Sequence, residues 1–462
     1  MVFSSLSFVF FILPLFLLCD RLAMLQPLAS ARWVRNIPLL VLSLFFYTWG
    51  ESATVLLLLG LSLLNYLAGM AVHRFSRPLP VLFGAVSVNL LVLFFYKYCH
   101  WFLTSIFPAL AWDAPALPLG ISFFTFHAIS YLVDIYRKVI PPARNALDFF
   151  TYFCMFPHLV AGPIIRYSQI QNEIVATRKP SSDLFCFGMY RFLLGLNKKV
   201  LIANTIAPLA DIAFNSTPAN LTVLDAWIGA VAYTIQLYFD FSGYSDMAIG
   251  LAAMAGFRFE ENFFRPYSAA SVREFWRRWH ISLSRWFVDY LFIPLGGSRA
   301  SAFITYRNLL LVFVLCGLWH GADATFLLWG LWHGVFLVFE RLYGGEKPVL
   351  PCAIRRLYTM AVVVLGWVLF RAETTESAFA FLAQMASGPF AVPLFAVHVV
   401  PLVALGVGVL LCALPDSLFP RPTAHTEETL PTLHFCVHAL LAVISFGMLC
   451  LSSTNPFLYF NF

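Results

Sequence analysis

Two histidines stand out because each lies in a Trp-His-Gly triplet inside an apolar run. The triplets are centred on His320 and His333, which are 13 residues apart. Histidine titrates near neutral pH and can take the proton of a hydroxyl without a metal, so His320 is a candidate general base. On one straight helix the two side chains would lie about 20 Å apart, which argues against a shared metal ion. A hydrogen-bonded packing role for His320 is the alternative, and both interpretations remain open.

A second candidate is the segment 271–290, in which arginines and tryptophans alternate. We interpret it as an amphipathic helix at a polar–apolar interface, and anchoring alone would explain that pattern. Because arginine pairs with phosphate and stacks on rings, the alternative is a floor that binds an anionic, nucleotide-bearing donor. A single helix over this segment would present two faces. The first face would hold Arg273, Trp276, Arg277, His280 and Ser284. The second would hold Glu274, Arg278 and Arg285.

The composition places these residues in a membrane protein. Of 462 residues, 60% are hydrophobic and 11% are charged, with a mean hydropathy of +0.80. Soluble chains are about 45–50% apolar and about 25% charged. One soluble core of this length cannot hide so much apolar surface, and the same figures exclude disorder, collagen and coiled coil. Only the bilayer can take up this surface.

Several other classes of function are excluded by composition and motif. The net charge of +6 is small and dispersed, so no nucleic-acid partner is expected. The nine cysteines are scattered without a C-x-x-C pair, which argues against a disulfide framework and against a structural zinc site; no metal is expected. The sequence contains no G-x-S-x-G, P-loop, G-x-G-x-x-G or H-E-x-x-H motif.

Two carboxylates, Asp240 and Asp246, interrupt an apolar run together with Gln236 and two serines. An ionised group at mid-bilayer costs about 2.5–3.5 kcal/mol, so such residues face a bundle interior and a partner. The run is therefore interpreted either as polar pairing between helices or as the polar wall of a substrate tunnel.

The apolar runs predict an all-α polytopic protein with about eleven or twelve transmembrane helices. The first run lacks a preceding basic residue and a cleavage site, so we expect a retained span. Short cytoplasmic loops collect Lys and Arg, and basic residues follow the first, third and fifth spans, so we expect the N-terminus outside. The linker Arg421–Glu428 is then expected in a cytoplasmic loop, which leaves Phe462 outside. The expected spans are 3–24, 36–50, 52–73, 79–98, 118–136, 184–214, 222–256, 303–319, 324–343, 357–370, 391–414 and 432–451. Interfacial or re-entrant elements are expected at 101–110, 147–163, 281–295 and 376–386.

Segment 148–167 breaks the pattern of regular spans. It holds two prolines and a Gly-Pro step and closes on Arg166 and Tyr167, which do not suit a continuous helix. Irregular backbone at membrane depth persists only where protein buries it or where it lines a wet cavity. We therefore predict a re-entrant loop that faces a cavity.

Several motifs together resemble the membrane-bound O-acyltransferase family, in its branch of bacterial polysaccharide acetyltransferases of the alginate O-acetylation type. The most specific are Phe275–Ser284 and, about 40 residues later, Gly317–Gly321. Further matches lie at 1–5, 117–126, 161–167, 238–246 and 456–462, so the resemblance covers the whole chain. It implies one membrane domain over 1–462, with N-terminal helices at 1–140, a catalytic core at 141–345 and C-terminal helices at 346–462. The helices would form a ring around a central tunnel.

The resemblance places the deep catalytic histidine of the family at His320 and its second functional histidine at His280. His280, Trp279 or backbone amides near Gly321 would polarise the carbonyl of the acyl donor. The substrate-binding residues expected beside them are Arg166, Trp279, Trp319, Asp240, Asp246 and Arg277.

The implied function is transfer of an acetyl group from a cytoplasmic donor across a bacterial inner membrane, for O-acetylation of an exported polysaccharide such as alginate or cellulose. Acetyl-CoA is the expected donor, and no bound cofactor is expected. The expected partners are a periplasmic acetyltransferase of the SGNH-hydrolase type and a polysaccharide synthase complex. Two alternatives remain: D-alanyl transfer to teichoic acid, and a translocation module for an anionic carrier that does no chemistry. Direct transfer and a covalent acyl-enzyme also both remain open.

Overall fold

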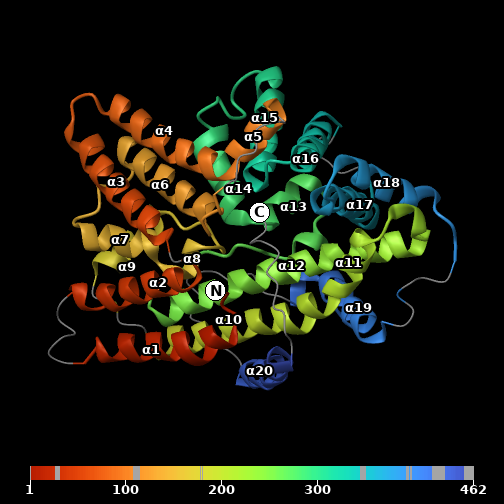
Figure 1. Cartoon of the computed structure of the whole chain (residues 1–462), viewed down its shortest axis with the longest axis horizontal. Helices are drawn as coiled ribbons and strands as arrows, with labels where there is room; N and C mark the ends of the chain where they lie inside the picture. The colour runs from red at the N-terminus through yellow and green to blue at the C-terminus, as the bar shows by residue number, and fades with distance from the viewer. Residues whose placement is uncertain are drawn as a thin grey trace. The chain divides into compact units, whose positions relative to one another are not determined.

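The computed structural model describes residues 2–25, 32–51, 53–107, 115–176, 178, 181–343, 350–391, 395, 398–418 and 432–451. Within these ranges, every regular element is a helix (Figure 1). The chain divides into two compact units, each taken separately below. The first comprises Met1–Leu196, Tyr244–Glu261 and Thr423–Asn455, and the second comprises Asn197–Gly243, Asn262–Pro422 and Pro456–Phe462.

The first unit is built around three apolar helices that lie side by side, α3, α4 and α6 (Figure 1). Asn65 and Asn89 exchange two side-chain hydrogen bonds of 3.0 and 2.9 Å between α3 and α4. Gly69 lets α6 approach α3, since a Cβ there would lie 2.6 Å from the Tyr131 ring. The helices of this unit are α1 (Leu13–Leu22), α2 (Asn36–Gly50), α3 (Val55–Arg74), α4 (Pro78–Lys97), α5 (Cys99–Ile106), α6 (Ile121–Tyr136), α7 (Ala146–Cys154), α8 (Phe156–Leu159), α9 (Tyr167–Val175), α10 (Ser182–Asn197) and α20 (Thr432–Leu451).

The break in regular helix predicted within 148–167 is confirmed, whereas a re-entrant loop that faces a cavity stays a prediction. Helix α7 ends at Cys154, α8 is a single turn, and irregular backbone continues until α9 begins at Tyr167. Protein buries this stretch, and side chains satisfy part of its backbone. The Ser43 hydroxyl accepts a hydrogen bond from the Phe156 amide at 3.1 Å, and the Tyr152 hydroxyl donates one to the Ile165 carbonyl at 3.1 Å.

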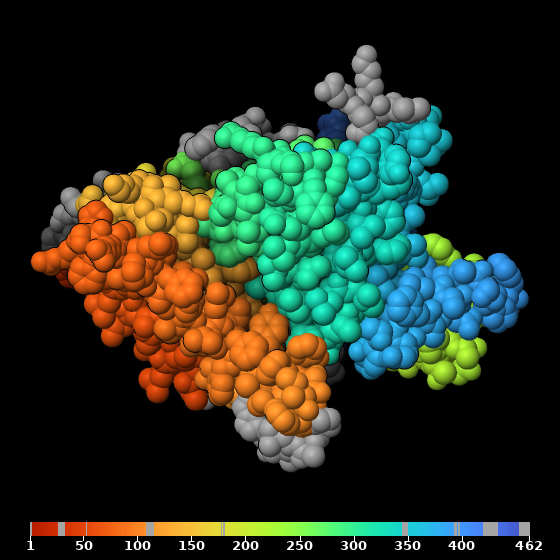
Figure 2. Space-filling model, turned by 90° about the horizontal axis from the view of Figure 1, so that it is seen from above, coloured from red at the N-terminus to blue at the C-terminus, as the bar shows by residue number. Residues whose placement is uncertain are grey.

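The second unit holds a tight helical hairpin formed by α15 (Ala302–His320) and α16 (Ala324–Tyr343). Gly317 and Gly330 let the two backbones meet, because a Cβ at either position would lie 2.2 or 2.3 Å from a carbonyl oxygen of the other helix. Helix α17 (Cys352–Arg371) packs against α16. In Figure 2 the hairpin forms a continuous green-to-cyan surface. The other helices of this unit are α11 (Thr205–Asn215), α13 (Val272–Arg278), α14 (Ile281–Phe287), α18 (Thr375–Ser387) and α19 (Val399–Ala413).

Helix α12 (Val223–Met254) contributes residues to both units, because the boundary between them falls after Gly243. It carries the polar run from Gln236 to Asp246 as continuous helix. Asp240 therefore belongs to the second unit and Asp246 to the first.

Apolar helices of membrane-spanning length are present among the described residues. Five qualify by length and composition, namely α3, α4, α15, α17 and α20 from Leu433, and α2, α6 and α19 are shorter apolar helices. On α3 and α4, Leu56 and Phe83 expose about three-quarters of their surface (73% and 74%), as lipid contact requires. The count of eleven or twelve spans stays a prediction. The expected loop Arg421–Glu428 and the motif at 456–462 lie outside the described residues.

Candidate active site

His280 lies at a break between two short helices. Helix α13 ends at Arg278 and α14 begins at Ile281, and His280 has a left-handed backbone with φ of 42°. For a residue other than glycine, this conformation costs about 1–3 kcal/mol of stability, so it persists only where contacts with the surrounding structure hold it. The prediction of one helix with two continuous faces over 271–290 is therefore wrong. Arg273 and Arg277 are exposed while Trp276 is buried, so these three do not form one face.

Asn262 holds this break in place, although no sequence motif pointed to it. Its backbone carbonyl accepts a hydrogen bond from the Ile281 amide at 2.9 Å. Its side-chain Oδ1 lies 3.1 Å from Nδ1 of His280 and accepts from the Ser282 hydroxyl at 2.8 Å. Burial lowers the pKa of His280 to about 3, so the imidazole is neutral at physiological pH.

His320 is the last residue of α15 and is held by aromatic rings. Its imidazole makes T-shaped contacts with the rings of Trp329 and Phe370, each at a centroid distance of 5.1 Å. Gly321, which follows it, has no room for a side chain, since a Cβ there would lie 2.2 Å from the Phe326 ring. The hairpin turn therefore places His320 in a defined orientation.

The structure brings His280 and His320 together around Trp319. The Trp319 ring lies 4.8 Å from the His320 ring and 6.5 Å from the His280 ring, between centroids. All three side chains are buried. This arrangement supplies two buried imidazoles beside one indole, and a positioned imidazole can take the proton of a hydroxyl in acyl transfer.

Trp279 and His333 pack in an aromatic cluster next to this centre. The Trp279 ring lies 4.9 Å from Trp367, and the His333 ring lies 5.1 Å from Trp276 and 5.4 Å from Trp329. Trp329 thus contacts both His320 and His333, which lie on different helices. Among the described residues, no three His, Cys, Asp or Glu side chains gather as a metal site.

Arg278 anchors the end of α13 through an ionic network that the sequence did not reveal. It pairs with Glu274 at 2.5 Å and with Asp416, just after α19, at 2.8 Å. Asp416 also accepts from Arg265 at 3.0 Å and from Ser268 at 2.9 Å. Burial raises the pKa of Asp416, but these hydrogen bonds outweigh it and hold the pKa at about 2. Glu274 lies four residues before Arg278, in the order that favours such a pair on a helix.

Both carboxylates of α12 are paired with buried cations. In the second unit, Asp240 pairs with Lys199, and both side chains are at most 3% exposed. In the first unit, Asp246 pairs with Arg191, which also pairs with Glu261 at 2.5 Å. This pairing favours the interpretation of polar contacts between helices, and a role for either carboxylate in binding substrate stays a prediction.

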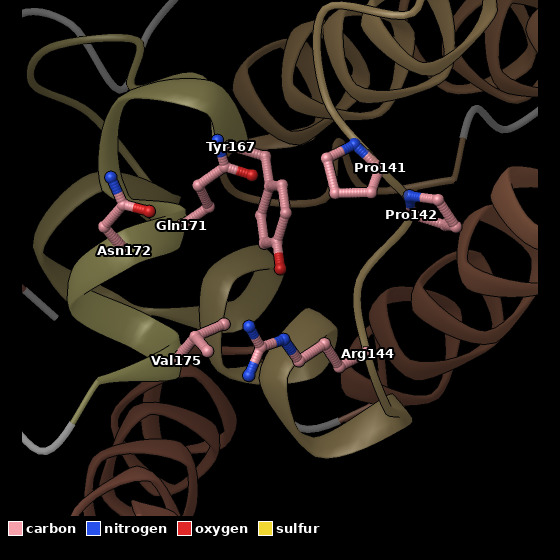
Figure 3. Close-up of a pocket in the computed structure, with 7 residues that line it drawn as sticks. All are labelled: Pro141, Pro142, Arg144, Tyr167, Gln171, Asn172 and Val175. Carbon is pink, nitrogen blue, oxygen red and sulfur yellow. The ribbon is translucent and has the colours of Figure 1, made fainter.

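Arg166 lies in the first unit, at the start of α9. Its amide donates to the Gln169 side chain at 2.8 Å, and its own side chain is half-buried. The next residue, Tyr167, lines a pocket of about 260 Å³ (Figure 3). In that view the Tyr167 hydroxyl points into the pocket toward the guanidinium of Arg144. The remaining lining residues are Pro141, Pro142, Gln171, Asn172 and Val175.

The all-helical fold with apolar spans and a buried histidine pair agrees with comparisons to known proteins. The family model described as MBOAT, membrane-bound O-acyltransferase family, matches residues 138–345. The chain belongs to this family, and it is a multi-pass membrane enzyme, an O-acyltransferase. The resemblance inferred from the motifs is thereby confirmed.

Individual relatives show which acyltransferases the chain is similar to. The probable alginate O-acetylase AlgI of Pseudomonas aeruginosa is 44% identical over 400 residues, which cover 84% of this chain and 75% of that protein. The peptidoglycan O-acetyltransferase of Helicobacter pylori is 34% identical over 425 residues, which cover 83% of this chain and 80% of that protein. The teichoic acid D-alanyltransferase of Bacillus subtilis is 30% identical over 342 residues, which cover 68% of this chain and 82% of that protein.

Proposed function

We propose that this enzyme O-acetylates an exported polysaccharide of the alginate type, with His320 as the general base and His280 as the second functional histidine. The observation that carries the proposal is the arrangement of both imidazoles around Trp319. The relatives named as alginate O-acetylases, at 44% identity, support acetyl as the group and a polysaccharide as the acceptor. Cellulose and peptidoglycan remain further acceptors to test, the latter because of the Helicobacter relative.

In the proposed reaction an acetyl group moves from a thioester to a hydroxyl, and His320 transfers the proton. The acceptor hydroxyl forms a C–O bond to the thioester carbonyl carbon while His320 takes the hydroxyl proton. The C–S bond then breaks, and the leaving thiolate takes that proton from the His320 imidazolium to become a free thiol. Trp279, His280 and backbone amides near Gly321 are the candidates for stabilising negative charge on the carbonyl oxygen.

For the donor we propose acetyl-CoA, bound from the cytoplasmic side. The basic residues Arg137, Lys138 and Arg144 follow the fifth predicted span, and the positive-inside rule puts them in the cytoplasm. The pocket lined by Tyr167 also includes Arg144, whose guanidinium suits phosphate. In the second unit, taken by itself, the exposed Arg277 is a separate candidate for contact with an anionic donor. We further propose an inner-membrane location, a periplasmic partner of the SGNH-hydrolase type and a polysaccharide synthase complex.

The decisive experiment is acetyl transfer from radiolabelled acetyl-CoA in vesicles that contain the protein. Removing a general base costs typically about 10²–10⁴-fold, so His320→Ala should lower turnover by at least about 100-fold. The matched control is His73→Ala, an exposed histidine at the end of α3, which should keep wild-type turnover. Wild-type turnover of His320→Ala would refute the assignment.

D-alanyl transfer is the second candidate, because one relative at 30% identity is a teichoic acid D-alanyltransferase. Competition between acetyl-CoA and a D-alanyl-charged carrier protein separates the two donors. We expect acetyl-CoA to win, and preferential consumption of the charged carrier would reverse the assignment. The third alternative, translocation without chemistry, loses much of its motivation because Asp240 and Asp246 are neutralised by Lys199 and Arg191.

A further inference from the structure

Asn262 contacts three consecutive residues at the break that carries His280. Its backbone carbonyl accepts from the Ile281 amide at 2.9 Å, and its Oδ1 accepts from the Ser282 amide at 3.3 Å and from the Ser282 hydroxyl at 2.8 Å. The same Oδ1 lies 3.1 Å from Nδ1 of His280. Asn262 is fully buried, and it lies 18 residues before His280 in the chain.

These contacts determine which atom of the Asn262 amide faces His280. The Ser282 backbone amide can only donate, so the Asn262 atom that it meets must be the carbonyl oxygen and not the NH2 group. The Ser282 hydroxyl also lies 3.4 Å from Nδ1 of His280, but it donates its hydrogen to Oδ1 at the shorter distance of 2.8 Å. A carbonyl oxygen can only accept, so Nδ1 of His280 must carry a hydrogen and donate it. In a neutral imidazole with a hydrogen on Nδ1, the other ring nitrogen, Nε2, holds a lone pair.

We infer that Asn262 is a positioning residue that fixes His280 as the Nδ1–H tautomer, so that His280 offers Nε2 as a hydrogen-bond and proton acceptor. The inference rests on the proposed function and sharpens it. A neutral His280 of this tautomer cannot donate from Nε2 to the thioester carbonyl. Charge on the carbonyl oxygen is then stabilised by other donors, namely the Trp279 indole or backbone amides near Gly321, while His280 accepts from a hydroxyl or thiol.

Two features of the site agree with this role. The left-handed backbone of His280 is costly, and the hydrogen bond from Ile281 to the Asn262 carbonyl is one of the contacts that hold it. Burial keeps the imidazole neutral, so its tautomer, and not its charge, decides whether Nε2 donates or accepts.

The experiment compares Asn262→Leu with Asn262→Asp in the full-length protein. The leucine variant removes the acceptor, whereas the aspartate variant keeps an oxygen at the same place and adds a negative charge. We expect Asn262→Leu to lower kcat by about 10- to 100-fold with little change in KM, as loss of an orienting contact typically does. Asn262→Asp should restore most of kcat at alkaline pH.

The pH profile provides a readout that a purely structural role would not move. A carboxylate beside Nδ1 stabilises the imidazolium and raises the pKa of His280. Because the proposed acceptor must be neutral, the acid limb of the kcat profile of Asn262→Asp should move to higher pH. The matched control is Asn308→Leu, which removes another fully buried amide in the same unit and its 2.9 Å bond to the Leu295 carbonyl. This control should leave the profile in place.

The tautomer itself is observed by 15N NMR of histidine-labelled protein, with the His280 signals assigned by their loss in His280→Gln. The wild type should show a protonated Nδ1 and an unprotonated Nε2, and Asn262→Leu should shift His280 toward the Nε2–H form. An Nε2–H tautomer in the wild type, or unchanged kcat in Asn262→Leu, overturns the inference. If His320→Ala still abolishes transfer in that case, the proposed function stands. If His320→Ala and His280→Gln both keep wild-type turnover, the proposed function fails instead.

Discussion

The two histidines of the candidate site are held in different ways. His280 is oriented by polar contacts with Asn262, whereas ring edges from Trp329 and Phe370 confine His320. The hydrogen bond to Asn262 selects one tautomer of His280, and the ring contacts restrict the orientation of His320. A general base needs a defined position beside the hydroxyl whose proton it takes, so the assignment of His320 as general base agrees with its surroundings.

Residue types identified the histidines but not the side chains that support them. The motifs around His280 and His320 led directly to both positions. Asn262 and Lys199 left no signal, because their partners lie 18 and 41 residues away, far beyond the three or four residues that separate neighbouring side chains on one helix. A resemblance between motifs carries over the reacting groups, whereas hydrogen-bond and ion-pair partners are visible only once the chain is folded.

The Lys199–Asp240 pair gives a prediction at this scale. Lys199→Met leaves a buried carboxylate without its cation, which typically destabilises a protein by about 3–5 kcal/mol. The double variant Lys199→Met, Asp240→Leu should regain most of that stability, because a buried ion pair can be replaced by apolar side chains at little cost. Thermal unfolding in detergent measures both effects.

The control for this pair is Asp211→Asn in the same unit. Asp211 pairs with Arg371 at 3.2 Å, but its side chain is half-exposed, so its loss should cost only about 0–1 kcal/mol. Equal melting temperatures for Lys199→Met and Asp211→Asn would show that the buried pair has no special weight.

At the scale of elements, the apolar runs predicted the helices well, and breaks inside polar segments were predicted poorly. The spans expected at 36–50, 324–343 and 432–451 coincide with α2, α16 and α20, because long apolar runs leave a membrane chain little choice but helix. Segment 271–290 was expected to be one helix, yet it breaks at His280. The break depends on Asn262, and helical periodicity contains no information about so distant a contact.

The hairpin of α15 and α16 yields a second prediction. Gly317→Ala would place a methyl group 2.2 Å from the Phe326 carbonyl oxygen, so the two helices must move apart. Because His320 lies on α15 and Trp329 on α16, separation also loosens the ring contact that orients His320. We expect both a lower melting temperature and lower acetyl transfer.

Gly60→Ala is the matched control for the hairpin variant. Gly60 lies inside α3 with nothing within 4 Å of the added Cβ, so alanine should be neutral or stabilising by up to about 1 kcal/mol. Wild-type transfer by Gly317→Ala would mean that close packing of the hairpin is not needed for the candidate site.

At the scale of the whole molecule, the composition predicted a membrane protein, but it did not predict how the chain divides into two compact units. The predicted parts 1–140, 141–345 and 346–462 are contiguous in sequence, whereas the compact units are assembled from separate segments. Helix α12 contributes to both units without any break in its apolar pattern, so no change in composition marks the boundary. Such a division depends on long-range contacts, which a hydropathy profile does not contain.

The sidedness of the chain is the last prediction, and the proposed donor depends on it. The positive-inside rule places the loops after α3 and α6, with Arg74, Arg77, Arg137 and Arg144, in the cytoplasm. Fluorescent-protein and alkaline-phosphatase sandwich fusions in a Gram-negative host test this arrangement. Insertions at residues 76 and 144 should fluoresce and lack phosphatase activity, and insertions at 51 and 117 should do the reverse. The opposite pattern would put the pocket that includes Arg144 on the periplasmic side, where acetyl-CoA is absent, and would redirect the search for the donor to a periplasmic acyl carrier.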